Sequence, residues 1–127
     1  MQQQHLFEYA IIRVVPRVER EEFMNIGVIL FCQKQKFLHA KYLINENKLK
    51  TFSSNLDLIE LHEHICSIER ICKGKAEAGP IGKLDIASRF RWLTATRSTV
   101  VQTSRVHPGF CTDAAETLDK LFSQMVD

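Results

Sequence analysis

Residues 6–18 are mostly apolar, β-branched or aromatic, which is typical of a strand covered on both faces. Side chains alternate between the faces of a strand, so Tyr9, Ile11 and Arg13 share one face. Pro16 cannot donate a backbone hydrogen bond. The strand therefore ends at this proline or lies at the edge of a sheet.

Two further strands are predicted, at residues 25–32 and 37–44. Short polar segments separate the three strands, which indicates an antiparallel meander. Gly27 interrupts the second strand. A lone glycine in a strand usually marks a bulge or a close approach of two backbones, and we expect one of these here.

The period of the apolar pattern changes to 3.6 at residues 56–72, which predicts a helix. Residues 53–55 offer an N-cap, Asp57 suits the first turn, and Gly74 ends the helix. The buried stripe is expected to consist of Leu58, Leu61, Ile65, Ile68 and Cys72.

The pattern after this helix is more irregular. Residues 75–82 read as a loop, and residues 84–95 have a short helical stripe. Residues 98–104 are rich in β-branched side chains and predict a strand. The sequence His-Pro-Gly at 107–109 predicts a turn.

A last helix begins after Asp113, an N-cap followed three residues later by Glu116 as in a capping box. Its buried stripe is expected to consist of Ala115, Leu118, Leu121, Phe122 and Met125. The order of elements predicts a single α+β domain over residues 1–127. We expect a mostly antiparallel sheet of about four strands, with the meander first and the two main helices packed on one face.

Composition supports a folded chain. Of 127 residues, 45% are hydrophobic and 25% are charged, as in ordinary globular proteins. No apolar run is long enough to cross a membrane, and the first residues lack the features of a signal peptide. The four cysteines are too few and too scattered for a disulfide scaffold. These features predict a soluble, cytoplasmic protein that does not interact with membranes.

Charge is distributed unevenly. The net charge of +2 arises from a neutral segment at 1–72, a segment of +5 at 73–107 and a segment of −3 at 108–127. An anionic partner is therefore expected to bind the middle segment.

The first candidate site surrounds the first hairpin and contains Arg13, Arg17, Glu21, Glu22 and Asn25. One interpretation is an internal ion pair that fixes the register of the hairpin, with Asn25 bonded to the turn. The other is an anion pocket, in which Arg13 and Arg17 bind the anion and Glu21 or Glu22 acts as a base.

The second candidate site contains Arg89, Arg91, Trp92, Arg97 and Ser98. Arginines interleaved with aromatic rings and small hydroxyls suit phosphate binding. The alternative is a solvated basic face with the aromatic rings in the core. The chain contains neither a phosphate-binding P-loop nor a GxGxxG motif, and no cofactor is predicted.

His62, His64 and Cys66 are candidate metal ligands on the predicted helix. His62 and His64 diverge by about 200° on a helix, so they cannot bind one ion together. His62 and Cys66 are suitably spaced, but no third ligand is evident, and no metal is predicted.

Three motifs carry a resemblance to a known family: E-F-x-N-I-G-V at 22–28, R-F-R-W-L at 89–93 and R-S-T at 97–99. With them, nearly the whole chain resembles the bacterial family called domain of unknown function 3037 (DUF 3037). Members often have proline before the last motif, where this chain has Thr96. Members are often encoded beside a HipA-like kinase, so the resemblance implies an accessory or regulatory partner of such a kinase.

Three functions follow from these features. The first is a noncatalytic binding module whose arginine-rich groove engages an acidic or phosphorylated protein. The second is an enzyme acting on nucleic acids or nucleotides, with Glu21 or Glu22 as base. The third is nonspecific nucleic-acid binding. If Arg13 lies beside Ser98 in the sheet, both candidate sites could line one groove; a homodimer formed through an edge strand also remains open.

Overall fold

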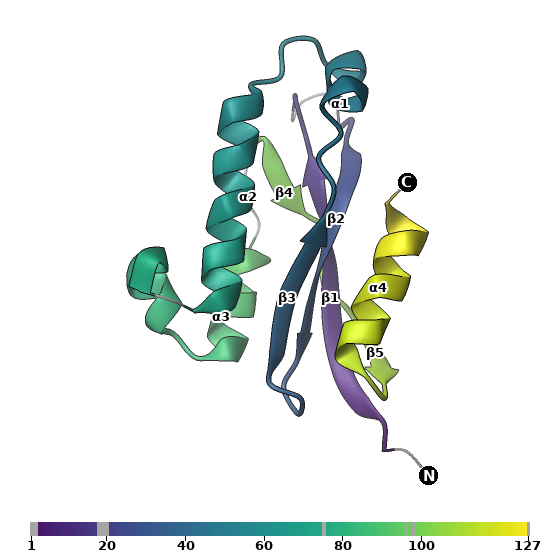
Figure 1. The fold of residues 1–127 in the computed structure, drawn as a ribbon, viewed down its shortest axis with the longest axis vertical. Helices are drawn as coiled ribbons and strands as arrows, with labels where there is room; N and C mark the ends of the chain where they lie inside the picture. Colours follow the sequence, from purple (N-terminus) through teal and green to yellow (C-terminus); the bar gives the residue numbers. More distant parts are fainter. Residues whose placement is uncertain (1–2, 18–20, 75, 96, 98, 127) are drawn as a thin grey trace.

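A computed structural model of the chain describes residues 3–17, 21–74, 76–95, 97 and 99–126. Its centre is an antiparallel sheet (Figure 1). The strands are β1 (His5–Val14), β2 (Met24–Cys32), β3 (Phe37–Tyr42), β4 (Val101–Thr103) and β5 (His107–Cys111). The first three form the predicted meander, in the spatial order β3-β2-β1.

The opposite edge of β1 pairs with two short strands in succession. β4 lies beside residues 12–14 of β1, and β5 lies beside residues 5–9. The predicted turn at 107–109 is wrong, because these residues begin β5. Proline is tolerated there because β5 is an edge strand. The α+β class is confirmed, with five strands rather than about four.

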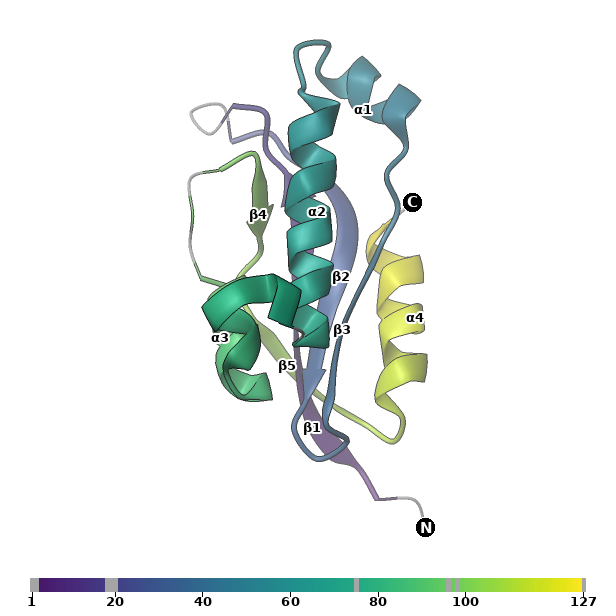
Figure 2. The same ribbon diagram turned by 60° about the vertical axis from the view of Figure 1, so that its left-hand side comes forward.

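The helices are α1 (Glu46–Phe52), α2 (Leu58–Lys73), α3 (Ile86–Leu93) and α4 (Ala114–Met125), with a 3-10 segment η2 (Ala76–Lys83). The two long helices lie on opposite sides of the sheet and not on one face as expected (Figure 2). The reason is that β2 is apolar on both faces. Ile29 and Phe31 pack in the cluster with α2, whereas Val28 and Leu30 pack with α4.

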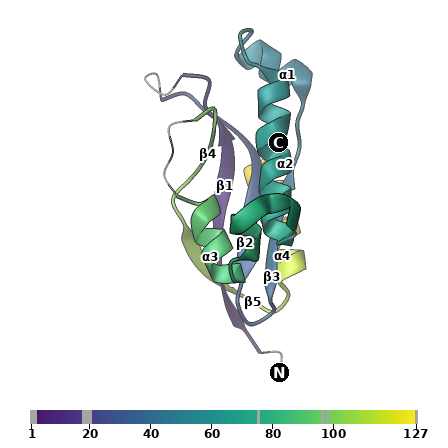
Figure 3. The ribbon, with the colours of Figure 1, turned by 90° about the vertical axis from the view of Figure 1, so that its left-hand side faces the viewer.

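α3 lies on the same side of the sheet as α2 (Figure 3). Its Phe90 is fully buried and stacks on Phe31 of β2, with 5.2 Å between the ring centroids. This contact fixes the side of α3 that faces the sheet. Arg89, Arg91 and Trp92 therefore lie on the sides of α3 that are not buried in the core, and Trp92 is 46% exposed.

The ends of α2 follow from local chemistry. The predicted cap at 53–55 is replaced by Asp57, whose carboxylate accepts from the backbone N–H groups of Ile59 and Glu60. Gly74 ends the helix in the left-handed conformation, at φ 70°, as its position in the sequence indicates. The predicted N-cap Asp113 of α4 is confirmed, since it accepts from the Glu116 N–H.

Gly27 lies where two backbones approach closely, as predicted. The pairing of β1 and β2 shifts between Ile12 and Arg13, so that Ile26 is an extra residue in β2. A Cβ atom on Gly27 would lie 2.6 Å from the Lys41 carbonyl oxygen. Glycine is therefore required by space at this bulge.

Across the part of the chain that the structure describes, none of the helices is both long enough and apolar enough to cross a membrane.

Candidate functional site

Arg13 lies on the sheet face that α4 covers. Its strand neighbours are Asn25 of β2 and Gln102 of β4, and the Asn25 amide donates to the Met125 carbonyl at the end of α4. The guanidinium carbon of Arg13 lies 4.1 Å from the centroid of the half-exposed Phe23 ring. The Arg13 guanidinium thus packs against an aromatic ring at the surface.

Two polar atoms in this region are buried without a hydrogen-bond partner among the described residues. They are Arg13 Nε and Asn25 Oδ1, on directly paired residues of β1 and β2. Each such atom costs roughly 1–3 kcal/mol of desolvation. These two atoms are enclosed by the protein, so they are not available to a ligand at the surface.

The turn between β1 and β2 borders a pocket of about 510 Å³, which we call the end pocket. Arg17 and Glu22 line it together with Asp57 and Glu60 of the α2 region. Asp57 is engaged as the N-cap of α2. Glu21 lies on the same turn with a positive φ of 57° but does not line the pocket.

Arg89 binds the protein's own backbone. Its guanidinium donates to the carbonyls of Ile71 and Cys72, at 2.8 and 2.7 Å, and its Nε donates to the carbonyl of Leu84. A positive group at the C-terminal end of a helix is also stabilised by the helix dipole. Arg89 therefore joins the end of α2 to the start of α3 and has few donors left for a partner.

Arg91 is paired with Glu8 of β1 in a bidentate contact, with N–O distances of 2.8 and 3.1 Å. The hydrogen bonds to Glu8 raise the pKa of the Arg91 guanidinium above its ordinary value. Glu8 is the less exposed partner, at 24% against 57%. This pair anchors α3 to the sheet, so Arg91 too has a role inside the fold.

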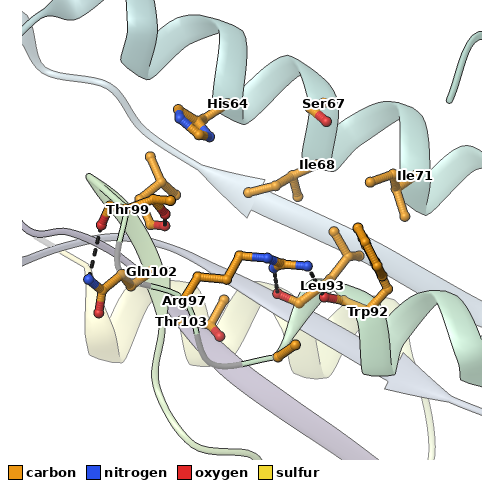
Figure 4. A pocket seen from close by; sticks show the side chains of 12 residues that line it. His64, Ser67, Ile68, Ile71, Trp92, Leu93, Arg97, Thr99, Gln102 and Thr103 are labelled. Carbon is orange, nitrogen blue, oxygen red and sulfur yellow. Dashed lines mark hydrogen bonds between the residues drawn. The ribbon is translucent and has the colours of Figure 1, made fainter. Parts of the chain in front are cut away.

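Trp92 and Arg97 lie beside a second pocket, which we call the inner pocket, between α2, α3 and the described residues within 95–103 (Figure 4). Its volume is about 180 Å³. Arg97 donates to the Trp92 carbonyl at 2.6 Å, and its guanidinium carbon lies 5.0 Å from the Trp92 ring centroid. Arg97 is thus fixed at the end of α3, with its stem forming one wall of the pocket.

The walls of the inner pocket differ in chemistry. Ile68 and Ile71 of α2 face Leu93 of α3 across the apolar part. His64 and Ser67 contribute polar groups from α2, and Figure 4 shows His64 at the end of the pocket nearest Thr99. An apolar floor with a few polar groups at its rim is the usual form of a recognition pocket.

The two pockets lie next to each other along α2. Glu60 lines the end pocket and His64 lines the inner pocket, one helical turn away and with 3.7 Å between carboxylate and ring. Val100 lines the former, while Thr99 and Val101 line the latter.

The structure separates Arg13 from Arg97. Arg13 lies on the sheet face that α4 covers, and Arg97 lies on the side of α2. The hypothesis that one groove contains both arginines is therefore wrong. Arg17 is the arginine of the first candidate site that lies on the same side of the molecule as Arg97, because both border pockets along α2. Ser98 lies outside the residues that the structure describes.

Sequence reasoning missed several residues of the inner pocket. Residues 64, 67, 68 and 71 recur at helical spacings of three and four. The sequence pattern therefore indicates that they lie together along one edge of the predicted stripe. Thr103 carried no such signal, because its position depends on how β4 pairs with β1. The structure also finds no cluster of three or more potential metal ligands within its described residues.

Residues 9–126 match the family described as "Protein of unknown function (DUF3037)". The match covers most of the chain, and the chain belongs to this family. No curated protein and no solved structure matches it.

Proposed function

We propose that this member of the DUF3037 family is a noncatalytic, cytoplasmic binding module that recognises a segment of another protein through its inner pocket. The observation that carries the proposal is Trp92, which is half-exposed beside a pocket with an apolar floor that the side chains of the described residues do not fill. Half-exposed tryptophan beside such a pocket is typical of residues that dominate the binding energy of protein interfaces.

The size of the inner pocket suits one side chain. An engineered apolar cavity of about 150 Å³ holds a benzene molecule. The inner pocket has about 180 Å³ and is floored by Ile68, Ile71 and Leu93. A branched aliphatic or aromatic side chain of the partner would therefore fill it and exclude water from these residues.

The rim of the pocket supports an acidic or phosphorylated group next to that side chain. Arg97 uses two of its guanidinium nitrogens on the carbonyls of Trp92 and Leu93, and a guanidinium has five N–H donors. The remaining donors suit a carboxylate or phosphate. Arg89 and Arg91 are engaged within the fold. Of the arginines in the two candidate sites, mainly Arg97 and Arg17 therefore remain to bind an anionic group of the partner.

A HipA-like kinase is the first partner to test. It is suggested by the family resemblance alone, and the pocket adds what the contact would require: one apolar side chain with an acidic or phosphorylated neighbour.

The chain offers a matched pair of variants for this test. Trp92 is 46% exposed and lies beneath Arg97, whereas Phe23 is 47% exposed and lies beneath Arg13 on the opposite face. We expect Trp92→Ala to weaken kinase binding in titration calorimetry by roughly 30-fold, or about 2 kcal/mol. Phe23→Ala should change the affinity by no more than about twofold.

Two results would count against the proposal. If Trp92→Ala and Phe23→Ala weaken kinase binding equally, the inner pocket is not part of the interface. A HipA-like kinase from the same genome that does not bind the wild-type chain would exclude the kinase as the partner.

A further inference from the structure

Among the residues that the structure describes, no strand pairs with the outer edge of β5. Its main contacts are with β1, and it lies outside the β3-β2-β1-β4 path. Val15 N–H donates to the Val100 carbonyl and Ser104 N–H donates to the Ile11 carbonyl, so the odd-numbered residues of β1 direct their backbone groups toward β4 and β5. The odd-numbered residues of β5 therefore pair with β1.

The backbone groups of Pro108 and Phe110 consequently point away from β1. Pro108 has no N–H, so the exposed edge presents its carbonyl together with the N–H and the carbonyl of Phe110. An edge of this kind is able to pair with another strand.

An exposed apolar pair lies on the same strands. Phe110 is 69% exposed and its neighbour across the pair, Leu6, is 54% exposed. The adjacent residues Phe7 and Cys111 pack in the cluster with α4, so Leu6 and Phe110 lie on the other face of the sheet. They lie beyond the contact of Glu8 with Arg91 that anchors α3.

We propose that the chain forms a homodimer in which β5 pairs antiparallel with β5 of a second copy, about a two-fold axis at Phe110. The Phe110 N–H of each copy then donates to the Phe110 carbonyl of the other, and the Thr112 N–H donates to the Pro108 carbonyl. The missing N–H of Pro108 leaves no carbonyl unpaired, because Thr112 already accepts a hydrogen bond from the Gln35 amide at 2.8 Å.

Charge favours a second copy as the occupant. Exposed Arg105 and the partly exposed His107 flank the start of β5, while exposed Asp113 and Glu116 follow its end. Antiparallel pairing places the start of one β5 beside the end of the other, so basic groups face acidic groups twice. The same arrangement lines up Leu6 and Phe110 of both copies in one apolar row.

Sedimentation velocity of the full chain between about 1 µM and 1 mM tests the proposal, because this range covers the affinities of weak interfaces. The wild-type chain should approach twice its single-chain mass of 14.7 kDa as the concentration rises. Phe110→Asp should remain at the single-chain mass. Leu43→Asp changes a residue of 51% exposure outside this surface and should dimerise as the wild type does.

A wild-type chain that stays at the single-chain mass throughout would overturn the proposal. So would a dimer that persists in Phe110→Asp. Circular dichroism verifies the fold of each variant, and Leu6→Gln replaces Phe110→Asp if that variant does not fold. Because this surface lies apart from the inner pocket, a negative result here leaves the proposed binding of a partner untouched, and the reverse also holds.

Discussion

Arg89 shows how a single side chain is committed by its surroundings. Its guanidinium lies against Gly74, where a Cβ atom would come within 2.7 Å of an Arg89 nitrogen. Gly74 is thus needed for its left-handed φ of 70° and also for the space that the guanidinium occupies. The last turn of α2 and the first turn of α3 depend on this contact.

Arg89→Met keeps an unbranched apolar stem and removes the hydrogen-bond donors of the guanidinium. We expect a loss of about 1.5–3 kcal/mol in the free energy of unfolding, because carbonyls at the end of α2 lose hydrogen bonds from a charged donor. Urea unfolding measures this loss. Arg105→Met, at an exposed position, should change the midpoint little, and equal effects of both variants would contradict this role of Arg89.

Cys72 gives the fold an alkaline sensitivity. Burial raises the pKa of its thiol from 9.0 to about 12, although Arg89 acts in the opposite direction. The unfolded chain thus loses this proton at lower pH than the native chain does. The contribution of the neutral thiol is fully present below pH 9 and is lost as the pH rises toward 12.

We therefore expect the stability of the wild-type chain to fall relative to that of Cys72→Ala by roughly 2 kcal/mol between about pH 8 and about pH 10.5. Urea unfolding of both proteins at the two pH values measures the difference. A difference that does not change with pH would show that Cys72 titrates alike in the native and unfolded states.

The residue types in the candidate sites could be read from the sequence, but their partners could not. Arg91 and Glu8 are far apart in the chain and meet only because α3 packs over β1. Nothing in the local sequence distinguishes Arg97, at the rim of a pocket, from Arg89, which is bound to backbone carbonyls.

Ser104 links β4 and β5 into one edge. Its hydroxyl accepts from the Ile11 N–H and donates to the Arg105 carbonyl, both at 2.9 Å, and the residue is 5% exposed. The hydroxyl thus supplies a hydrogen bond where regular pairing with β1 is interrupted. The two short strands act as one interrupted strand.

Ser104→Ala leaves the buried Ile11 N–H without a partner, and we expect it to lower the free energy of unfolding by about 1–3 kcal/mol. The Ile11 amide should also exchange its hydrogen faster, which amide exchange observed by NMR would detect. The exposed Ser54→Ala is the control. Unchanged exchange at Ile11 in Ser104→Ala would exclude this role of the hydroxyl.

Helices were predicted correctly where the periodic pattern of apolar residues is strong. α2 and α4 have clear apolar stripes, and both helices were predicted, although Asp57 caps α2 instead of residues 53–55 and Ala114 is buried in α4 instead of Ala115. α1 was missed because Leu49 is its only buried residue, so it has no stripe. The sequence predicts a turn at 107–109 because Pro108 and Gly109 favour turns, but the edge position of β5 allows a strand there.

The whole molecule divides into two sides. α4 covers one face of the sheet near Arg13, and α2 with α3 covers the other face and forms both pockets. The double coverage of β1 was evident from its sequence, but the side taken by each helix depends on how the chain crosses the sheet. Arg13 and Asn25 of the first candidate site consequently lie on the side of α4, whereas Arg17 and Glu22 border the end pocket on the side of α2.

We propose that a partner occupies the inner pocket, and the chain carries a natural reporter for this binding. Trp92 is the only tryptophan among 127 residues, so labelling with 5-fluorotryptophan gives a single ¹⁹F resonance from the pocket rim. The measurement is this spectrum during titration with an unlabelled HipA-like kinase. We expect the resonance to shift or broaden as the kinase binds, in the wild type and in Phe23→Ala alike, whereas a resonance that stays unchanged when sedimentation shows a complex would contradict the claim.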